Sequence, residues 1–167
     1  MRFTPAGLAL SLVLATAASV GHSATPQPLD PRAAMLVREG QTALSGGNVE
    51  GAIDAFEAAM AIQPGSTQIT LHLAEATRRQ GMQGKALHYY REALERDPQN
   101  LDAIAGEGAA LVEKGAIEKA RRNLARLQSL CGRNCTQAAA LAARIERGPA
   151  ERVVTAEAPK GDTAVTN

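Results

Sequence analysis

The hydrophobic and polar positions of the chain repeat with a step of 34 residues between residues 33 and 134. A glycine, an alanine, a large apolar residue, another small or apolar residue and a proline recur in register in the first two copies. The third copy has lost the aromatic residue and the proline. The positions are Gly47, Gly81 and Gly115; Ala52, Ala86 and Ala120; Phe56, Tyr90 and Leu124; Ala59, Ala93 and Leu127; and Pro64, Pro98 and Gly132. This pattern predicts three structural units, at 33–66, 67–100 and 101–134.

Each unit has the pattern of two α-helices joined by a tight turn. The recurring alanine and the large residue one turn later share a helix face, which allows close helix pairing. The recurring glycine suits the left-handed conformation that ends a helix, and the proline ends the second helix. The units close with Ser66, Asn100 and Asn134, which we expect to cap the helix that follows. Asp30 and Pro31 provide a cap and a first-turn proline for the first helix.

A further helix is expected over residues 136–147, after the third unit. It has no partner helix, so it would serve as the terminal cap that repeat arrays need, with Arg144, Glu146 and Arg147 on its polar outer face. Residues 148–167 are polar, lack helical periodicity and are expected to form a disordered tail. The predicted fold is all-α, with seven helices in all.

In these repeated positions the chain resembles the tetratricopeptide repeat family, whose unit is a 34-residue helix–turn–helix. The resemblance implies an α-solenoid with a concave groove formed by the first helix of each unit. It further implies that a partner segment binds there and that the groove is lined by the residues at matching repeat positions. In the first two units these include Val37, Gln41, Leu44, Gln68, Leu71, Glu75 and Arg78, and in the third unit Asp102, Ala105, Ala109 and Val112.

The resemblance also makes one ligand class doubtful. Chaperone-binding members of the family hold a terminal carboxylate with lysine and asparagine side chains in the groove. The matching places here are Val37, Gln41, Gln68 and His72. These residues lack the positive charges of that clamp, so we do not expect a C-terminal carboxylate as the ligand.

Residues 1–24 have the features of a secretory signal peptide. Arg2 precedes a short apolar run, and small residues follow it before the linker at 25–32. The apolar run is short for a membrane span, although an uncleaved signal anchor is the alternative. No cysteine precedes Cys131, so a lipoprotein attachment site is not expected. We expect a periplasmic or secreted protein without a stable membrane span once the signal is cleaved.

Composition narrows the function further. Aromatic residues make up 2% of the chain, and the 18 Lys and Arg residues nearly balance the 17 Asp and Glu residues, for a net charge of +1. A nearly neutral chain with few aromatic residues argues against general nucleic-acid binding. His72 and His88 form no catalytic arrangement that the sequence can support, and no room remains for a catalytic domain. We therefore expect no enzymatic activity, no cofactor and no metal site.

Cys131 and Cys135 flank the turn between the third unit and the final helix. In an exported chain, such a close pair favours a disulfide, which would fix the last helix to the array. A redox-active pair is one alternative, although the C-x3-C spacing differs from the usual C-x2-C spacing. The other alternative is that the two cysteines form half of a metal site, although zinc needs four ligands.

Together these features predict a non-catalytic adaptor of the bacterial cell envelope that binds a protein or peptide partner, for example in pilus, secretion or envelope assembly. Two alternatives remain. The three units carry charges of −3, +1 and +2, so the chain could assemble head to tail as a structural protein. It could also be a thiol-redox accessory protein that uses Cys131 and Cys135.

Overall fold

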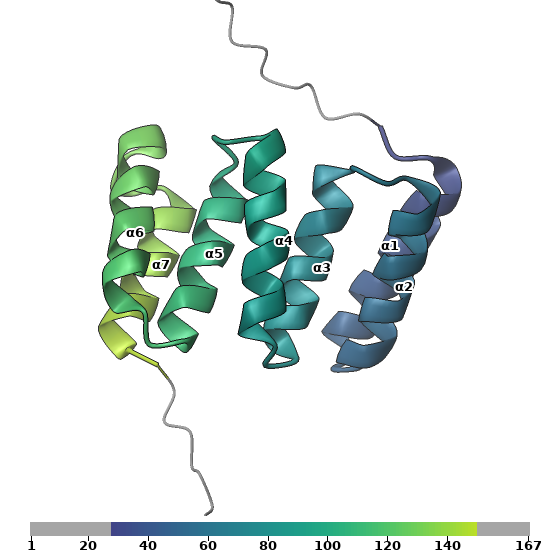
Figure 1. The fold of residues 1–167 in the computed structure, drawn as a ribbon, viewed down its shortest axis with the longest axis horizontal. Coiled ribbons are helices and arrows are strands. Elements are labelled where there is room, and N and C mark those ends of the chain that lie inside the picture. The colour runs from purple at the N-terminus through teal and green to yellow at the C-terminus, as the bar shows by residue number, and fades with distance from the viewer. Residues whose placement is uncertain (1–27, 150–167) are drawn as a thin grey trace, which may run out of the picture.

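The computed structural model describes residues 28–149, which form seven α-helices and no strand. The predicted signal peptide at 1–24 and all but two residues of the predicted tail lie outside this range. The helices stand across the long axis of the molecule and follow one another along it, from α1 and α2 at one end to α6 and α7 at the other (Figure 1). They are α1 (Pro31–Ser45), α2 (Val49–Ile62), α3 (Thr67–Arg79), α4 (Gln83–Arg96), α5 (Leu101–Glu113), α6 (Ile117–Cys131) and α7 (Thr136–Arg147).

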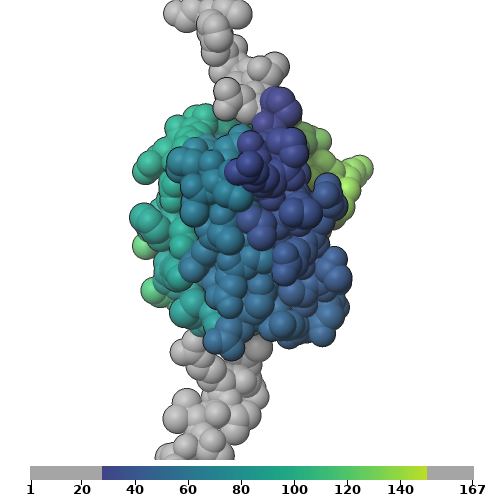
Figure 2. Space-filling model, turned by 90° about the vertical axis from the view of Figure 1, so that its right-hand side faces the viewer, coloured from purple at the N-terminus to yellow at the C-terminus, as the bar shows by residue number. Residues whose placement is uncertain are grey.

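The helices form two rows. Within each unit the two helices pack closely, as α1 with α2, α3 with α4 and α5 with α6. The odd-numbered helices also contact one another in order, from α1 to α3 to α5 to α7, whereas α2, α4 and α6 contact no other even-numbered helix. The odd-numbered helices therefore form a continuous inner row, and the even-numbered helices form an outer row. Seen from the N-terminal end of the array, α1 and α2 form much of the visible surface (Figure 2).

The repeated small residues make this pairing possible. Ala52, Ala86 and Ala120 are fully buried, as are Phe56 and Ala93. Two apolar clusters result, one centred on α1, α2 and α3 and the other on α4 to α7, and Tyr89 contacts both. The prediction that small and large residues alternate on one helix face is confirmed.

The turns also follow the sequence pattern. Gly47, Gly81 and Gly115 have φ angles of 82°, 84° and 80°, in the left-handed region that glycine adopts at little cost. Ser66 and Asn100 cap α3 and α5, as predicted, and the Asn100 side chain accepts a hydrogen bond from the Ala103 N–H at 2.9 Å.

One predicted cap is wrong. Asn134 does not cap the last helix, because the residue at the start of α7 is Cys135 and its side chain makes no capping hydrogen bond. The reason is that α6 continues to Cys131, whereas α2 and α4, the second helices of the other units, end one repeat position earlier. The turn is therefore displaced by one residue relative to the repeat, and α7 begins one position later.

Two threonines occupy places in the first helix of the second unit where an apolar side chain would be expected in a core. Thr70 and Thr77 are fully buried. Each hydroxyl donates a hydrogen bond back to its own helix, Thr70 to the Ser66 carbonyl and Thr77 to the Leu73 carbonyl. These local bonds satisfy the hydroxyls, so the core tolerates both residues.

Candidate functional site

A pocket of about 540 Å³ opens on the inner row of helices. All four inner helices line it, and Tyr90 of α4 reaches it between α3 and α5. The lining residues are Gln41 from α1; Gln68, Leu71, His72, Glu75 and Arg78 from α3; Tyr90; Asp102, Ala105, Gly106 and Ala109 from α5; and Ala140, Leu141 and Arg144 from α7.

Most of the groove residues proposed from the sequence lie together in this pocket. They are Gln41, Gln68, Leu71, Glu75, Arg78, Asp102, Ala105 and Ala109. Three others do not line it. Val37 and Val112 are 3% and 1% exposed, because their helix faces turn toward neighbouring helices, and Leu44 packs against the N-terminal apolar cluster.

Sequence reasoning did not include the contribution of α7. Ala140, Leu141 and Arg144 form the fourth wall of the pocket, and the sequence had placed Arg144 on a polar outer face. The sequence did contain a signal for this contribution. The helix that follows a complete unit takes the next place in the inner row, and α7 is such a helix. Tyr90 was predicted as a packing residue only, and His72 as an ordinary surface or groove residue.

The middle of the pocket is formed by small residues. Ala105, Gly106 and Ala109 lie on α5, and Ala140 lies on the neighbouring helix α7. A Cβ atom at Gly106 would overlap the Tyr90 ring, so glycine is needed for the ring to lie against the α5 backbone. Together with Leu71 and Leu141, which also line the pocket, these small residues could accommodate a large apolar side chain.

A network of charged groups lies at one end of the pocket. Arg78 pairs with Glu75 at 2.8 Å and also with Glu113. Arg144 of α7 pairs with Glu113 at 3.0 Å, so this carboxylate joins α3, α5 and α7. Arg79 donates to Glu75 at 2.7 Å, and the Tyr90 hydroxyl donates to Glu75 at 3.1 Å.

The network shifts the titration of its members. Burial opposes ionisation of Glu75, but the hydrogen bonds and charges of Arg78 and Arg79 outweigh it and lower the pKa of Glu75 below its usual value. Burial, with the nearby Glu75 charge, raises the pKa of Tyr90. Burial alone would lower the pKa of Arg78, but Glu75 and Glu113 raise it. At neutral pH Glu75 and Arg78 are therefore charged, and the Tyr90 hydroxyl beside them is neutral.

The other end of the pocket is polar but carries less charge. His72 lies 3.2 Å from the amide nitrogen of Gln41 and stacks on the Phe56 ring, with centroids 5.1 Å apart. Burial lowers the pKa of His72, so the ring is neutral at neutral pH. Asp102 accepts a hydrogen bond from Gln137 at 2.9 Å, which adds a second link between α5 and α7.

A comparison with protein families identifies the repeats. Residues 37–100 match the tetratricopeptide repeat family. Residues 37–100 therefore consist of tetratricopeptide repeats. No curated protein sequence gives a significant match to it.

Solved structures of tetratricopeptide repeat domains have the same fold. The first such domain of RPAP3 (Spaghetti), bound to an HSP90 peptide, is 22% identical over 71% of this chain and 94% of its own, with a TM-score of 0.63. The Sgt2 domain of Aspergillus fumigatus is 21% identical over 77% and 92%, with a TM-score of 0.65. The Yersinia enterocolitica type III secretion chaperone SycD, in complex with a YopD peptide, is 20% identical over 68% and 86%, with a TM-score of 0.59.

The residues at the positions of the family's carboxylate clamp do not form such a clamp in this structure. Val37 is buried, and Gln41 and His72 contact each other, so they do not present two cations to a ligand. The arginines that do reach the pocket come from the opposite end, on α3 and α7.

Other kinds of site find little support in the described part of the array. Between residues 28 and 149, no group of three or more His, Cys, Asp or Glu side chains could hold a metal ion. Within the same range, no helix combines the length and apolar character needed to cross a membrane. Cys131 and Cys135 lie next to each other at the turn before α7, with Cα atoms 5.8 Å apart.

Proposed function

We propose that this protein acts by binding, as an adaptor that holds a segment of a partner protein in the pocket of its inner helix row. The observation that carries the proposal is the pocket itself, with small residues on its floor, apolar walls at Leu71 and Leu141 and polar groups at both ends. Such a lining can bury an apolar side chain and fix its orientation by hydrogen bonds. Tetratricopeptide folds are interaction scaffolds, and the RPAP3 and SycD structures each contain a bound peptide.

We further propose that the adaptor works in the cell envelope, as a periplasmic or secreted protein in pilus, secretion or envelope assembly. This part rests on the leader-like pattern of residues 1–24. It is tested by cell fractionation and by the mass of the protein recovered from the envelope. A full-length protein found only in the cytoplasm would contradict it.

The test of the pocket is a crosslinking pull-down from the envelope fraction of the source cells with a matched pair of variants. Ala139 and Ala140 are adjacent and exposed on α7, but only Ala140 lines the pocket. Ala140→Tyr should therefore lose the partner, whereas Ala139→Tyr should retain it. Leu71→Arg, which places a charge on the apolar wall, should also lose it. Retention of the partner by both Ala140→Tyr and Leu71→Arg would overturn the proposal.

We also propose that Cys131 and Cys135 form a disulfide. The Cα separation of 5.8 Å lies within the range that disulfides require. Alkylation of the unreduced protein, followed by mass spectrometry, should find neither thiol modified, and prior reduction should expose both. Alkylation without reduction would exclude the bond. A bond that mild reductant opens readily would instead favour the thiol-redox alternative.

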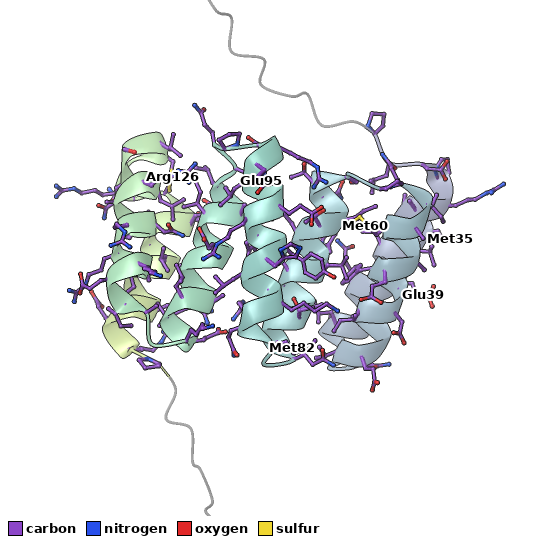
Figure 3. The ribbon with its side chains drawn as sticks, viewed as in Figure 1. Met35, Glu39, Met60, Met82, Glu95 and Arg126 are labelled. Atoms are coloured by element: carbon purple, nitrogen blue, oxygen red, sulfur yellow. A yellow bond between two sulfur atoms is a disulfide. The ribbon has the colours of Figure 1, made fainter. Side chains whose placement is uncertain are left out.

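One structural observation favours self-assembly as a second candidate. Exposed acidic residues of α2, among them Glu50 and Asp54, lie at the opposite end of the array from the basic residues of α6 (Figure 1). Met35 is 59% exposed on the same α1–α2 end, where it points away from the array together with Glu39 (Figure 3). Salt-dependent oligomers in sedimentation experiments would support this candidate. A monomer at high concentration and low salt would exclude it.

A further inference from the structure

A second hollow continues the pocket beyond its charged end. Its volume is about 590 Å³, and Arg78 and Arg144 line both hollows. The two arginines and Glu113, which pairs with both, form an ion bridge between the hollows. We call the second hollow the arginine pocket. Its lining is Arg78, Arg79, Gly81, Gln83, Val112, Glu113, Arg144, Arg147, Gly148 and Pro149.

The arginine pocket has an excess of positive charge. Four arginines line it against one glutamate, so the lining carries +3, and counting Glu75, which pairs with Arg78 and Arg79, still leaves +2. Several donors remain available. Arg144 uses Nη1 on Glu113, Arg79 uses Nε on Glu75, and each guanidinium has five N–H groups. Within residues 28–149, Arg147 forms no ion pair.

One carboxylate oxygen of the ion bridge is left without a donor. Oε2 of Glu113 is buried and has no hydrogen-bond partner among the described residues. A buried carboxylate oxygen without a donor is unfavourable. Because this oxygen has almost no accessible surface, a bound chain does not reach it unless the side chains around it move. The charge excess and the two arginines that line both hollows together favour an acidic chain that passes from one pocket into the other.

We infer that the arginine pocket binds acidic side chains of the same peptide segment whose apolar residue occupies the first pocket. This inference rests on the proposed function and specifies its ligand. The ligand is a segment with a large apolar residue near two or more Asp or Glu residues. Arg78 is fixed by two carboxylates, so its guanidinium is held in place before the ligand arrives. Arg79 and Arg147, at the rim, would then contact the acidic residues directly.

The test begins with selection of random dodecapeptides on the immobilised full chain, followed by affinity measurements on the selected peptides by fluorescence anisotropy. Each peptide is compared with a version in which Asp and Glu are replaced by Asn and Gln. The charge variant is Arg79→Gln with Arg147→Gln. The matched control is Arg121→Gln with Arg122→Gln, which removes the same charge from exposed positions of α6, away from both pockets.

We expect the selected peptides to combine a large apolar residue with acidic residues. The charge variant should weaken them roughly fivefold, as expected for two partly exposed ion pairs. It should leave the neutral versions unchanged, and the control variant should bind like the wild type. Added salt should weaken the acidic peptides alone, because these contacts are screened. Equal weakening by the control variant would overturn the inference, since it would indicate only a general charge effect.

Two further outcomes separate this inference from the proposed function. Selected peptides that lack acidic residues, yet are blocked by Ala140→Tyr, would overturn the inference and leave the groove adaptor in place. Selected peptides that neither Ala140→Tyr nor Leu71→Arg affects would overturn both. Acidic peptides that Ala140→Tyr blocks and the charge variant weakens would support both.

Discussion

In the first helix pair, Gly40 of α1 lies against the ring of Phe56 from its own partner helix α2, whereas in the third pair Gly108 of α5 lies against Leu141 of α7. The two glycines occupy the same place in the 34-residue repeat. The third unit has Leu124 where the others have an aromatic residue, and the helix outside the repeat supplies the side chain that covers the glycine. A lost aromatic residue in one unit is thus compensated by the following helix.

This difference gives α7 two roles. Leu141 is 2% exposed in the C-terminal core and also lines the pocket, next to Ala140 and Arg144. At the N-terminal end, α1 and α2 form their own core, and only Gln41 of this pair reaches the pocket. Core packing and pocket lining are therefore largely separate at the N-terminal end and shared at the C-terminal end.

The largest expected effects come from truncating the two residues that cover the glycines. Phe56→Ala should destabilise the protein by about 3–5 kcal/mol and Leu141→Ala by about 2–5 kcal/mol, because each leaves a cavity in a buried cluster. In a repeat array the loss of stability should be largest in the helices next to the substituted residue. Hydrogen exchange should show lost protection in α7 for Leu141→Ala and in α1 and α2 for Phe56→Ala. Equal loss along the whole array in both variants would show that the two ends are not independent.

The sequence predicted the repeat and its turns well because small residues, glycines and prolines act locally. The buried alanines and the left-handed glycines needed only their own unit to be interpreted. The pocket was predicted in part, since Gln41, Leu71 and Glu75 are groove positions that the family resemblance implies and they line it. The contribution of Arg144 and Leu141 did not follow, because α7 lies outside the repeat and its orientation depends on which unit surface is left uncovered.

The cysteine pair gives a smaller effect that is confined to the C-terminal end. A bond between Cys131 and Cys135 closes a loop of a few residues and should stabilise the protein by about 2 kcal/mol in the chain-entropy model. The Cys131→Ser, Cys135→Ser double variant should lower the unfolding free energy by that amount, as measured by denaturation in urea. Reduction of the wild type should reproduce the loss and leave the double variant unchanged. No difference between reduced and oxidised wild type would argue against a stabilising bond.

Alanine substitution of Gly40 and Gly108 tests whether the side chain packed against each glycine can move aside. A Cβ at Gly40 meets the Phe56 ring, whereas a Cβ at Gly108 meets the end of the Leu141 side chain. Both changes gain helix propensity of about 1 kcal/mol, but only Leu141 can move aside by a rotamer change. We expect Gly40→Ala to destabilise by about 1–3 kcal/mol and Gly108→Ala by less than half as much. Adding Phe56→Leu to Gly40→Ala should recover part of the loss, and additivity of the two changes would contradict the proposed overlap.

The smallest expected effect is a pH dependence at the N-terminal half of the pocket. Burial against Phe56 lowers the pKa of His72 below its usual 6.5, so the unfolded chain takes up a proton before the folded one does. Stability should therefore begin to fall as the pH drops below 6.5, and the loss should level off below the pKa of the folded state. Unfolding free energies measured between pH 5 and 8 isolate this effect, since the pKa of Glu75 lies below its usual 4.5 and this group stays ionised.

Two histidine variants decide whether the effect belongs to the pocket. His72→Gln should remove the pH dependence, whereas His88→Gln, at an exposed position of α4, should retain it. Because His72 contacts Gln41 of α1 and Phe56 of α2, at the N-terminal end of the array, the same acid shift should leave hydrogen-exchange protection of α7 unchanged. An equal loss of protection in α7 would mean that the N-terminal end and the C-terminal end respond together, and the separation drawn from Gly40 and Gly108 would not hold.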